Sequence, residues 1–375
     1  MRIASIGGGP AGLYFALLMK KAFPQVEIDI YERNQEGDTF GWGVVFSDET
    51  LGNFERADPP TYHAIRRHFA YWGDIDTWVG DACVRSSGHG FCGMSRKQLL
   101  AIFHERCREL GVRLHFGSEV SDETMIEPAA LVIAADGVNS ALRARHAAHF
   151  KPSIRWGKCR FAWLGTTKRL EAFTFIFREN EHGLWQIHAY PFEAALSTFI
   201  VECHEDVWRR AGLDKADEAQ TLAYFEKLFA DHLGGHKLLA NRSVWRTFPE
   251  IRCERWSYGN LVLMGDSAHT AHFSIGSGTK LAMEDAIALC SAFQTHGLVD
   301  VPRVLAAYEG ERRIEVAKLQ RVARTSQEWF EHTARYMKQP PLQFTFNLMT
   351  RSRRITWDNL AVRDAKLMGE VREWF

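Results

Sequence analysis

The feature that most constrains the fold is a glycine-rich turn near the start of the chain, between two short runs of β-branched residues. The first run is RIASI (2–6), the turn is GGGPAG, and residues 13–23 follow it with the composition of a helix. A second strand-like run, 26–31, ends at Glu32. Strand, glycine-rich turn, helix, strand and acid in this order are typical of the βαβ unit that binds dinucleotides.

Each position of the turn has a physical task. Gly7 allows the tight turn, Gly9 lets the backbone approach a pyrophosphate, and Gly12 lets the helix pack on the strand. The helix begins with free N–H groups and the positive end of its dipole. Glu32, 20 residues after Gly12, can accept hydrogen bonds from a ribose diol and disfavours a 2′-phosphate. The pattern therefore indicates FAD or NAD over NADP, and a simple strand–helix turn is the alternative.

Composition excludes several kinds of partner. The 375 residues are 46% hydrophobic and 25% charged, and the formal net charge is zero. No global field attracts nucleic acid or anionic lipid, and the apolar runs are too short to span a bilayer. We expect no nucleic acid, no membrane, and a monomer or homodimer. No signal peptide is visible, and the seven cysteines include no CxxC pair, so reduced thiols in a cytoplasmic protein are expected.

Two further buried runs, 131–135 (LVIAA) and 261–264 (LVLM), also end in small-residue turns, ADG and GDSAH. Because ligands bind at the carboxyl ends of parallel strands, the three turns are expected to meet at one extended ligand, such as FAD. Between these runs, short aromatic and β-branched segments with period two predict an antiparallel sheet. These segments are 161–167, 173–178, 184–190 and 197–203.

The predicted fold class is α/β: a Rossmann-like FAD-binding domain of the GR2 type, with an inserted antiparallel β-sheet domain and C-terminal helices. Helices are expected at 95–110, 216–233 and 301–337, and Pro340-Pro341 would end the last of them. The predicted FAD-binding domain is discontinuous and comprises 1–70, 91–155 and 240–335. The predicted substrate-binding domain comprises 71–90 and 156–239, and a helical segment, 336–375, follows.

The stretch GDSAHTAHFSIGSGTK (265–280) has three interpretations. A metal site on His269 and His272 lacks a third and fourth ligand at a suitable spacing, so we expect no metal. A Ser/His/Asp nucleophile requires an elbow such as G-x-S-x-G, which GDSAH does not match. The third interpretation, a loop that holds a cofactor by its backbone, is the one we favour.

With these motifs in order, GGGPAG (7–12), DGVNSALR (136–143) and GDSAHTAHFSIGSG (265–278), most of the chain resembles a known family. It is similar to the FAD-dependent aromatic hydroxylases of the para-hydroxybenzoate hydroxylase type, the group A flavoprotein monooxygenases. Within that family the chain most resembles salicylyl-CoA 5-hydroxylases and anthraniloyl-CoA monooxygenases. The violacein-pathway hydroxylase of tryptophan derivatives is similar too. The matching segments are FGWGVVFSD (40–48), STFIVEC (197–203) and HFSIGSGTK (272–280).

The resemblance implies a set of FAD contacts. Asp266 would accept hydrogen bonds from ribityl hydroxyls, and Arg96 would bind the ribityl–phosphate part, with a solvated helix arginine as the alternative. Asp136, supported by Arg143, would help to hold the cofactor. The full set of implied cofactor-binding residues is Gly7, Gly9, Pro10, Ala11, Gly12, Glu32, Arg33, Gly41, Trp42, Gly43, Val44, Arg96, Asp136, Gly137, Asp266, Gly276, Gly278 and Thr279.

The resemblance also implies where substrate lies. Residues 41–44 would lie along the isoalloxazine ring, and the glycines of 276–278 would bring N–H groups to its pyrimidine edge. The family has proline where Phe273 stands and glycine–glutamine–glycine at 276–278, so loop contacts are expected to differ. Phe273 and Ile275 would form a wall of the substrate pocket.

Two histidines and two basic runs are further candidates. His272 and His188 would accept a phenolic proton, and a structural role for each is the alternative. RSRR (351–354) and Arg66-Arg67 are candidate contacts for coenzyme A phosphates, and solvated charge is the alternative.

The activity that the resemblance implies is aromatic ring hydroxylation. NAD(P)H would reduce the flavin transiently, O2 would add at C4a, and the resulting hydroperoxide would transfer one oxygen to an electron-rich ring. The expected substrate is an aryl-CoA thioester such as salicylyl-CoA, giving gentisyl-CoA. A free indole or phenol derivative, a flavin reductase of the geranylgeranyl reductase type and a non-catalytic FAD-binding protein are the alternatives.

Overall fold

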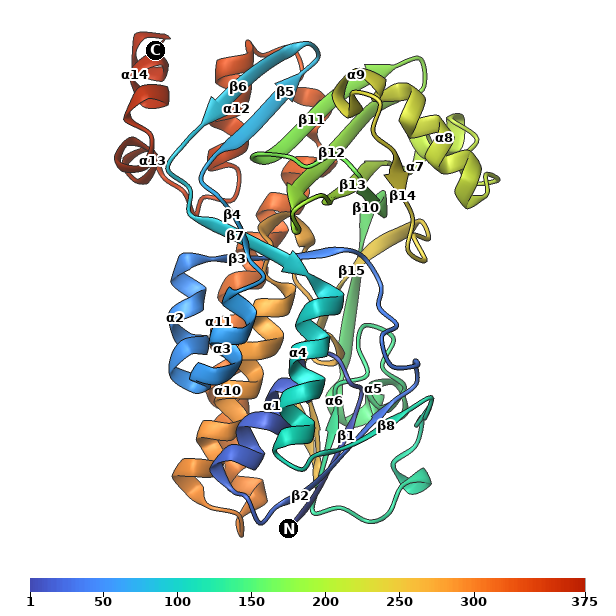
Figure 1. The fold of residues 1–375 in the computed structure, drawn as a ribbon, viewed down its shortest axis with the longest axis vertical. Coiled ribbons are helices and arrows are strands. Elements are labelled where there is room, and N and C mark those ends of the chain that lie inside the picture. Colours follow the sequence, from blue (N-terminus) through green and yellow to red (C-terminus); the bar gives the residue numbers. More distant parts are fainter. Residues whose placement is uncertain (375) are drawn as a thin grey trace.

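The computed structural model describes residues 1–374, with helices and strands mixed along the chain (Figure 1). The first sheet has six strands in the order β16-β17-β9-β1-β2-β8. Five of them are parallel, and β16 joins the edge antiparallel. The parallel sheet predicted from the sequence is confirmed. Its strands are β1 (Arg2–Ile6), β2 (Glu27–Glu32), β8 (Arg113–Phe116), β9 (Leu131–Ala134), β16 (Ser257–Tyr258) and β17 (Leu261–Leu263).

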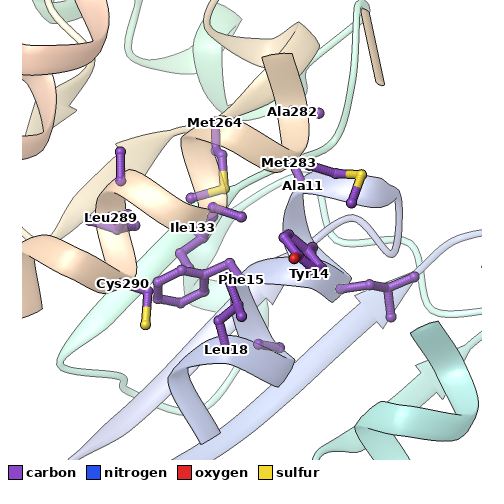
Figure 2. Packing of buried hydrophobic residues seen from close by; sticks show 14 of the residues in the cluster. Ala11, Tyr14, Phe15, Leu18, Ile133, Met264, Ala282, Met283, Leu289 and Cys290 are labelled. Carbon is purple, nitrogen blue, oxygen red and sulfur yellow. The ribbon is translucent and has the colours of Figure 1, made fainter. Parts of the chain in front are cut away.

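Two helices that follow the turns of this sheet, α1 (Pro10–Ala22) and α10 (Gly278–His296), pack against each other. Figure 2 shows the buried side chains between them, including Phe15 and Leu18 of α1 and Leu289 of α10. α1 is buried on all sides from Pro10 to Met19, whereas α10 keeps a partly exposed face. Ala11 and Ala282, near the two helix starts, both lie close to the turn after β17. Both helices therefore begin at the same edge of the sheet.

Two more helices cover this pair. α4 (Arg96–Glu109) packs on α1, and the long α11 (Val301–Glu331) packs on α10. The expected helix at 301–337 stops at Glu331 and continues only as a short 3₁₀ turn, η4 (Thr333–Arg335). The smaller elements near the first sheet are η1 (Glu123–Met125), α5 (Ala141–Arg145), α6 (Ala147–Phe150), η2 (Gly265–Ser267) and η3 (Phe273–Ile275).

The second sheet confirms the predicted antiparallel region. Its order is β14-β10-β13-β12-β11-β5-β6, with β15 paired to β10. All pairs are antiparallel except β11 with β5. The strands are β5 (Ile75–Val79), β6 (Ala82–Ser86), β10 (Pro152–Thr166), β11 (Phe173–Asn180), β12 (Gly183–Pro191), β13 (Ser197–His204), β14 (Leu238–Leu239) and β15 (Arg246–Cys253).

β10 begins nine residues before the run at 161–167 that predicted it. Its first half pairs with β15, from Pro152 opposite Cys253 to Trp156 opposite Pro249, and the register shifts after Trp156. Figure 1 shows this ribbon running between the two large sheets. The partner strand is almost a hundred residues away in the sequence, which local alternation does not encode.

A third, small antiparallel sheet lies between the two large sheets (Figure 1) and was not predicted from the sequence. It has the order β3-β7-β4, with β3 (Gly43–Ser47), β7 (Phe91–Ser95) and β4 (Ala70–Trp72). The helices α2 (Asp48–Ala57) and α3 (Pro59–Arg66) lie between β3 and β4 in the chain. The segment 41–44, expected to lie along a flavin ring, is partly a strand that pairs on one side with β7.

The helices expected in the tail are present; α12 packs on β5 and β6 of the second sheet, and α14 packs on α12. The predicted helix at 216–233 is broken at Phe229. Among residues 1–374 no helix has the length and apolar character needed to cross a membrane. The domain boundaries given above stay a prediction. The remaining helices are α7 (Glu205–Arg210), α8 (Glu218–Leu228), α9 (Ala230–Leu233), α12 (Pro341–Thr350), α13 (Trp357–Arg363) and α14 (Ala365–Trp374).

Candidate functional site

The three small-residue turns lie side by side at the carboxyl edge of the first sheet. Ile6 of β1 and Leu263 of β17 both stand opposite Ala134 of β9, so the three strands end level. Backbone hydrogen bonds continue past these ends, from Ala135 N–H to the Ile6 carbonyl at 2.8 Å and from Met264 N–H to the Ala134 carbonyl at 3.0 Å. The predicted meeting of the turns at one edge is confirmed.

Glycine is required at two positions of the first turn. Gly7 has φ +108°, and a Cβ there would lie 2.1 Å from the carbonyl oxygen of Ala135. A Cβ on Gly12 would lie 2.4 Å from the Gly7 carbonyl oxygen. At Gly9 a Cβ would meet no protein atom, and α1 begins there without a side-chain cap. The N–H groups of its first turn are therefore available to an anionic ligand next to open space.

Glu32 stands at the end of β2 and holds the glycine-rich turn. One carboxylate oxygen accepts the Gly8 N–H at 2.8 Å. The other accepts the backbone N–H of Asn34 at 2.9 Å and its side-chain amide at 2.6 Å. Only the oxygen that accepts the Gly8 N–H keeps a free lone pair, so a ribose contact stays a prediction. Arg33, beside it, is exposed.

Asp136 has an acceptor without a partner in the turn after β9. Its Oδ2 accepts the N–H of Ala141 at 2.9 Å, whereas its Oδ1 is buried with no hydrogen bond among the described residues. Burial raises the pKa of this carboxyl, partly offset by Ser140. An unpaired buried acceptor costs about 1–3 kcal/mol, so the Oδ1 atom is a fitting place for a hydroxyl donor. In the same turn Gly137 has φ +82° and faces open space.

Arg143 joins the second and third turns. Its guanidinium is buried and donates to the carbonyl oxygens of Val138 at 2.6 Å and Ser267 at 2.9 Å. Burial lowers its pKa. Its guanidinium is therefore occupied by the two turns, in agreement with the expected supporting role.

Asp266 and Arg96 face each other across the site without a direct bond. Asp266 is exposed to solvent, yet the surrounding protein desolvates its carboxylate and raises its pKa, against the opposing effect of His269 and Arg96. Exposure together with desolvation is expected of a side chain on the wall of a recess. Arg96 opens α4, and among the described side chains its guanidinium forms no hydrogen bond or ion pair, while desolvation lowers its pKa. Both are available to a ligand with hydroxyl and phosphate groups.

His269 belongs to a buried ionic cluster and not to the recess. Its Nε2 lies 2.7 Å from Asp285 Oδ2, and Arg312 Nε donates to Asp285 Oδ1 at 2.8 Å. Desolvation acts to raise the pKa of Asp285, but His269 and Arg312 outweigh it and hold that pKa low. The N–H of Gly265 also donates to Asp285 at 3.0 Å. The cluster therefore anchors the turn that carries Asp266.

The segment 41–45 lies between the second sheet and the loop at 276. Gly43 N–H donates to Thr198 Oγ1 at 3.1 Å, and the Tyr190 hydroxyl donates to the Gly43 carbonyl at 2.9 Å. A Cβ on Gly276 would lie 3.8 Å from Val45 Cβ, and Gly276 has φ +61°. The loop then enters α10 at Gly278 without a side-chain cap, just before Thr279. A second uncapped helix start therefore stands opposite residues 41–45.

Phe273 lies within an aromatic cluster against which Val45 of that segment also packs. Its ring centroid is 4.9 Å from Phe161, 5.9 Å from Trp163 and 6.2 Å from Phe248. The cluster continues to Trp72, Tyr190 and Ile200. Phe273 is thus surrounded by aromatic side chains, and its place in the wall of a substrate pocket stays a prediction.

Ile275 corrects one expectation. It packs against the core beneath the first sheet and not within the aromatic cluster. Residues 273–275 form a 3₁₀ turn, in which side chains two positions apart point in different directions. Phe273 and Ile275 therefore do not share one wall.

His272 and His188 are both buried, with exposed fractions of 3% and 2%. Between them lies Glu202, which is 1% exposed and was not singled out from the sequence. Its Oε2 is 2.8 Å from His188 Nε2, and its Oε1 is 3.7 Å from His272 Nε2. Burial lowers the pKa of His188 to about 3 and that of His272 to about 4, and it raises the pKa of Glu202 to about 7. The two histidines lie behind Phe273 and do not face open space.

Arg351 corrects the interpretation of RSRR as a uniform surface run. Its guanidinium points inward and donates to Ser326 Oγ at 2.9 Å and to the Ser274 carbonyl at 2.8 Å. It also lies 5.0 Å above the Phe330 ring. With its donors occupied, it is not a phosphate contact. Arg353 and Arg354 are exposed, as are Arg66 and Arg67, which line a shallow surface recess together with His63.

The two histidines of the 265–280 stretch have different hydrogen-bond partners. His269 pairs with Asp285, and His272 Nδ1 lies 2.8 Å from Ser274 Oγ. Among residues 1–374 no group of three His, Cys, Asp or Glu side chains is arranged to hold a metal ion. All seven cysteines are free thiols, six of them buried.

The residues at the three turns fit FAD. Two uncapped helix starts, an unpaired buried carboxylate oxygen on Asp136 and an unpaired guanidinium on Arg96 are present at one edge of the sheet. Gly9, Gly137 and Gly278 each border space in which a Cβ would meet no protein atom. Such donors and acceptors match a dinucleotide that carries a pyrophosphate and several hydroxyls.

Comparison with known proteins agrees with this geometry. Residues 1–323 match the family described as FAD binding domain. The chain is 43% identical over its whole length to salicyloyl-CoA 5-hydroxylase of a Streptomyces species, covering 74% of that protein. It is 36% identical to 3-hydroxy-4-methyl-anthranilyl-(aryl-carrier protein) 5-monooxygenase of Streptosporangium sibiricum, over 96% of this chain and 97% of that protein. A solved variant of 2-methyl-3-hydroxypyridine-5-carboxylic acid oxygenase shares the fold, with a TM-score of 0.74, 19% identity, and coverage of 96% of this chain and 98% of that one.

Proposed function

We propose, from the premise that this chain belongs to the FAD-binding-domain family of flavoprotein monooxygenases, that it hydroxylates the ring of an aryl thioester such as salicylyl-CoA. The observation that carries the proposal is the aromatic cluster around Phe273, which adjoins segment 41–45 beside the three turns. The thioester is favoured because both relatives act, by name, on aryl groups attached to a carrier. The product of salicylyl-CoA would be gentisyl-CoA.

The cofactor would be held by the residues described above. The N-terminus of α1 would bind the pyrophosphate, Glu32 a ribose, and Asp136, Asp266 and Arg96 the ribityl–phosphate part. The N-terminus of α10 would place its N–H groups and dipole at the flavin ring. FAD, reduced by NAD(P)H in this class of enzyme, supplies the activation of O2.

The chain's own residues would position the substrate ring and exclude water. Segment 41–45 and the Phe273 cluster would hold the substrate ring between them and keep water out of the reaction space. His272 and His188 are buried behind Phe273, so a phenolic proton would reach them only through neighbouring groups. We propose a cytoplasmic location on the basis of the free thiols, and a monomer or a homodimer.

The test is substrate-stimulated oxidation of NADH and NADPH by the purified holoenzyme. Salicylyl-CoA, free salicylate and indole would be compared at equal concentrations, with mass analysis of the product formed under ¹⁸O2. Stimulation by the thioester with one labelled oxygen in the product supports the proposal. Stimulation only by salicylate or indole would reject the thioester, and reduction of a substrate without oxygen incorporation would reject hydroxylation.

A further inference from the structure

The buried carboxyl of Glu202 stands between the two histidines that the sequence marks as candidate bases. Glu202 lies on β13 opposite Gln186 of β12, and His188 lies two residues further along β12. The Glu202–His188 contact is a hydrogen bond of 2.8 Å, and His272 approaches the other carboxyl oxygen at 3.7 Å. With an exposed fraction of 1%, the carboxyl has no access to bulk solvent. A carboxylate buried in this way is usually neutralised by a partner or by a proton.

Hydrogen bonds extend from this group to the C-terminal part of the chain. His272 Nδ1 lies 2.8 Å from Ser274 Oγ, which lies 2.8 Å from Ser326 Oγ. Ser326 in turn accepts from Arg351 Nε at 2.9 Å. These hydrogen bonds join the loop before α10, α11 and the end of α12, and the 3.7 Å contact of His272 brings them next to the Glu202–His188 pair of β13 and β12.

The charges around Glu202 do not by themselves supply a counter-ion in contact. Arg351 acts on Glu202 through space and is tied by its own hydrogen bonds to Ser326 and to the carbonyl oxygens of Leu348 and Ser274. Burial keeps both histidines neutral, since it places their pKa values well below 6.5. The titratable and charged groups facing Glu202 are His188, His272, Glu331, Arg351, Cys159 and Cys203.

A proton on Glu202 determines the tautomer of His188. If Glu202 is protonated it donates to His188 Nε2, and the ring carries its hydrogen on Nδ1. If Glu202 is ionised it accepts from Nε2–H, and Nδ1 becomes a bare acceptor. His188 Nδ1 is buried without a hydrogen bond among the described residues, so it can take either form. The state of one carboxyl therefore changes the polarity of the ring edge next to the aromatic cluster.

The rings of both histidines rest against Phe273. The centroid of Phe273 is 4.2 Å from that of His272 and 5.3 Å from that of His188. The His188 ring is also packed on Phe330 at 4.5 Å. The two imidazole rings thus connect Glu202 to Phe273 by direct packing.

We propose that Glu202 is a positioning residue of the hydroxylase, which holds the proton of the His188–Glu202–His272 cluster and thereby sets the position of Phe273 at the substrate ring. The proposal rests on the proposed function, because Phe273 is a pocket wall only if an aromatic ring binds beside it. Glu202 does not touch the substrate; it acts through the two imidazole rings.

The first test is spectroscopic and needs no substrate. Infrared difference spectra of the holoenzyme between about pH 6 and about pH 8 should show the loss of a carboxylic-acid C=O band. This band should be absent from Glu202→Gln, shifted in Glu202→Asp and retained in the matched control Glu331→Gln, which removes another acid facing the same cluster. A wild-type spectrum without this band would overturn the proposal, even if no variant folds.

The second test measures binding of salicylyl-CoA by the change in flavin absorbance, and KM and kcat separately. Between those two pH values the protonated fraction of a group with a pKa near 7 falls about tenfold. The Kd and KM of the wild type should follow that fraction, whereas Glu202→Gln should show a flat profile with kcat changed less than KM. Glu202→Asp should restore part of the pH dependence. A wild-type profile retained in Glu202→Gln would overturn the proposal.

Failure of the proposed function gives a different result. If the wild type neither binds nor oxidises salicylyl-CoA but does bind indole or salicylate, the thioester is rejected, and the same pH comparison is made with the compound that binds. If the C=O band titrates but ligand binding is independent of pH for every compound that binds, the positioning role of Glu202 is rejected.

Discussion

Removal of the Asp285 carboxylate should destabilise the fold and the turn that carries Asp266. Asp285 is fully buried and is shared by His269 Nε2, Arg312 Nε and the Gly265 N–H at 2.7, 2.8 and 3.0 Å. In Asp285→Ala the guanidinium of Arg312, 6% exposed, keeps only a distant contact with Glu284 at 3.4 Å. Breaking a buried ion pair by removing one partner costs about 3–5 kcal/mol, because the other charge stays buried.

The expected shift in melting temperature follows from the size of the chain. For 375 residues the unfolding entropy is about 0.8 kcal/mol per kelvin, so the loss corresponds to roughly 4–6 °C in Tm. Asp285→Asn keeps the shape of the side chain and one acceptor oxygen, so it should lower the Tm less. The measurement is the apparent Tm of the holoenzyme by circular dichroism at a fixed heating rate. Glu315→Gln serves as the control, because Glu315 makes only an exposed pair with Lys318 on α11.

The same variant should loosen the cofactor. Gly265 N–H loses its acceptor in Asp285→Ala, and Gly265 directly precedes Asp266, so FAD should dissociate faster during gel filtration than from the wild type. If the Tm of Asp285→Ala stays within about 1 °C of the wild type, the cluster does not hold the turn as described. If the Tm falls but FAD retention is unchanged, the turn is held by other contacts.

Three further outcomes are expected. Gly7→Ala should fail to fold or lose FAD, because its Cβ would overlap the Ala135 carbonyl, whereas Gly9→Ala should fold with an unchanged Tm and lose only FAD affinity; equal effects of the two would refute this. Asp266→Ala should weaken FAD binding about ten- to hundredfold, the loss of a charge-assisted hydrogen bond, measured by flavin fluorescence. The pKa of Glu202 is raised from 4.5 to about 7. Its contribution to the stability of the fold is therefore complete below about pH 4.5. This contribution, up to about 3 kcal/mol, is lost as the pH rises through about 7. Glu202→Gln should therefore gain Tm relative to the wild type at about pH 8 and not at about pH 5, and parallel curves would contradict the raised pKa.

The features that the sequence predicted are those encoded over short distances. The β1 turn, the start of α1 and the end of β2 lie within 32 residues, and each carries its own signal in glycine, apolar periodicity or an acid. The turns after β9 and β17 could be added because parallel strands bring their carboxyl ends to one edge. The family expected from these three motifs is confirmed by the match over residues 1–323 and by the two relatives.

The features that were missed depend on distant partners. β3 has no alternation that marks it as a strand, and its pairing with β7 is made between residues about 50 positions apart. Glu202 lies in STFIVEC, a segment noticed for its resemblance and its predicted strand. Because the residues before Glu202 are apolar at both odd and even positions, a strand of this pattern is expected to be buried on both faces, and this was a usable signal of a buried carboxyl. Arg351 looked like its basic neighbours, because only the three-dimensional fold turns it inward onto Ser274.

The two histidines of the 265–280 stretch connect this loop to different parts of the molecule. His269 ties its first turn to Asp285 behind the first sheet, and His272 ties its second turn to Ser274 and faces Glu202 on the second sheet. The loop is therefore fastened to both halves of the molecule, with the glycines of 276–278 between the two fastenings. Changes at His269 should then lower stability and FAD retention together, whereas changes at His272 should act on substrate affinity. The separation follows from which layer each ring packs against, and it agrees with the proposal that the loop acts through its backbone and Phe273 while the imidazoles hold them in place.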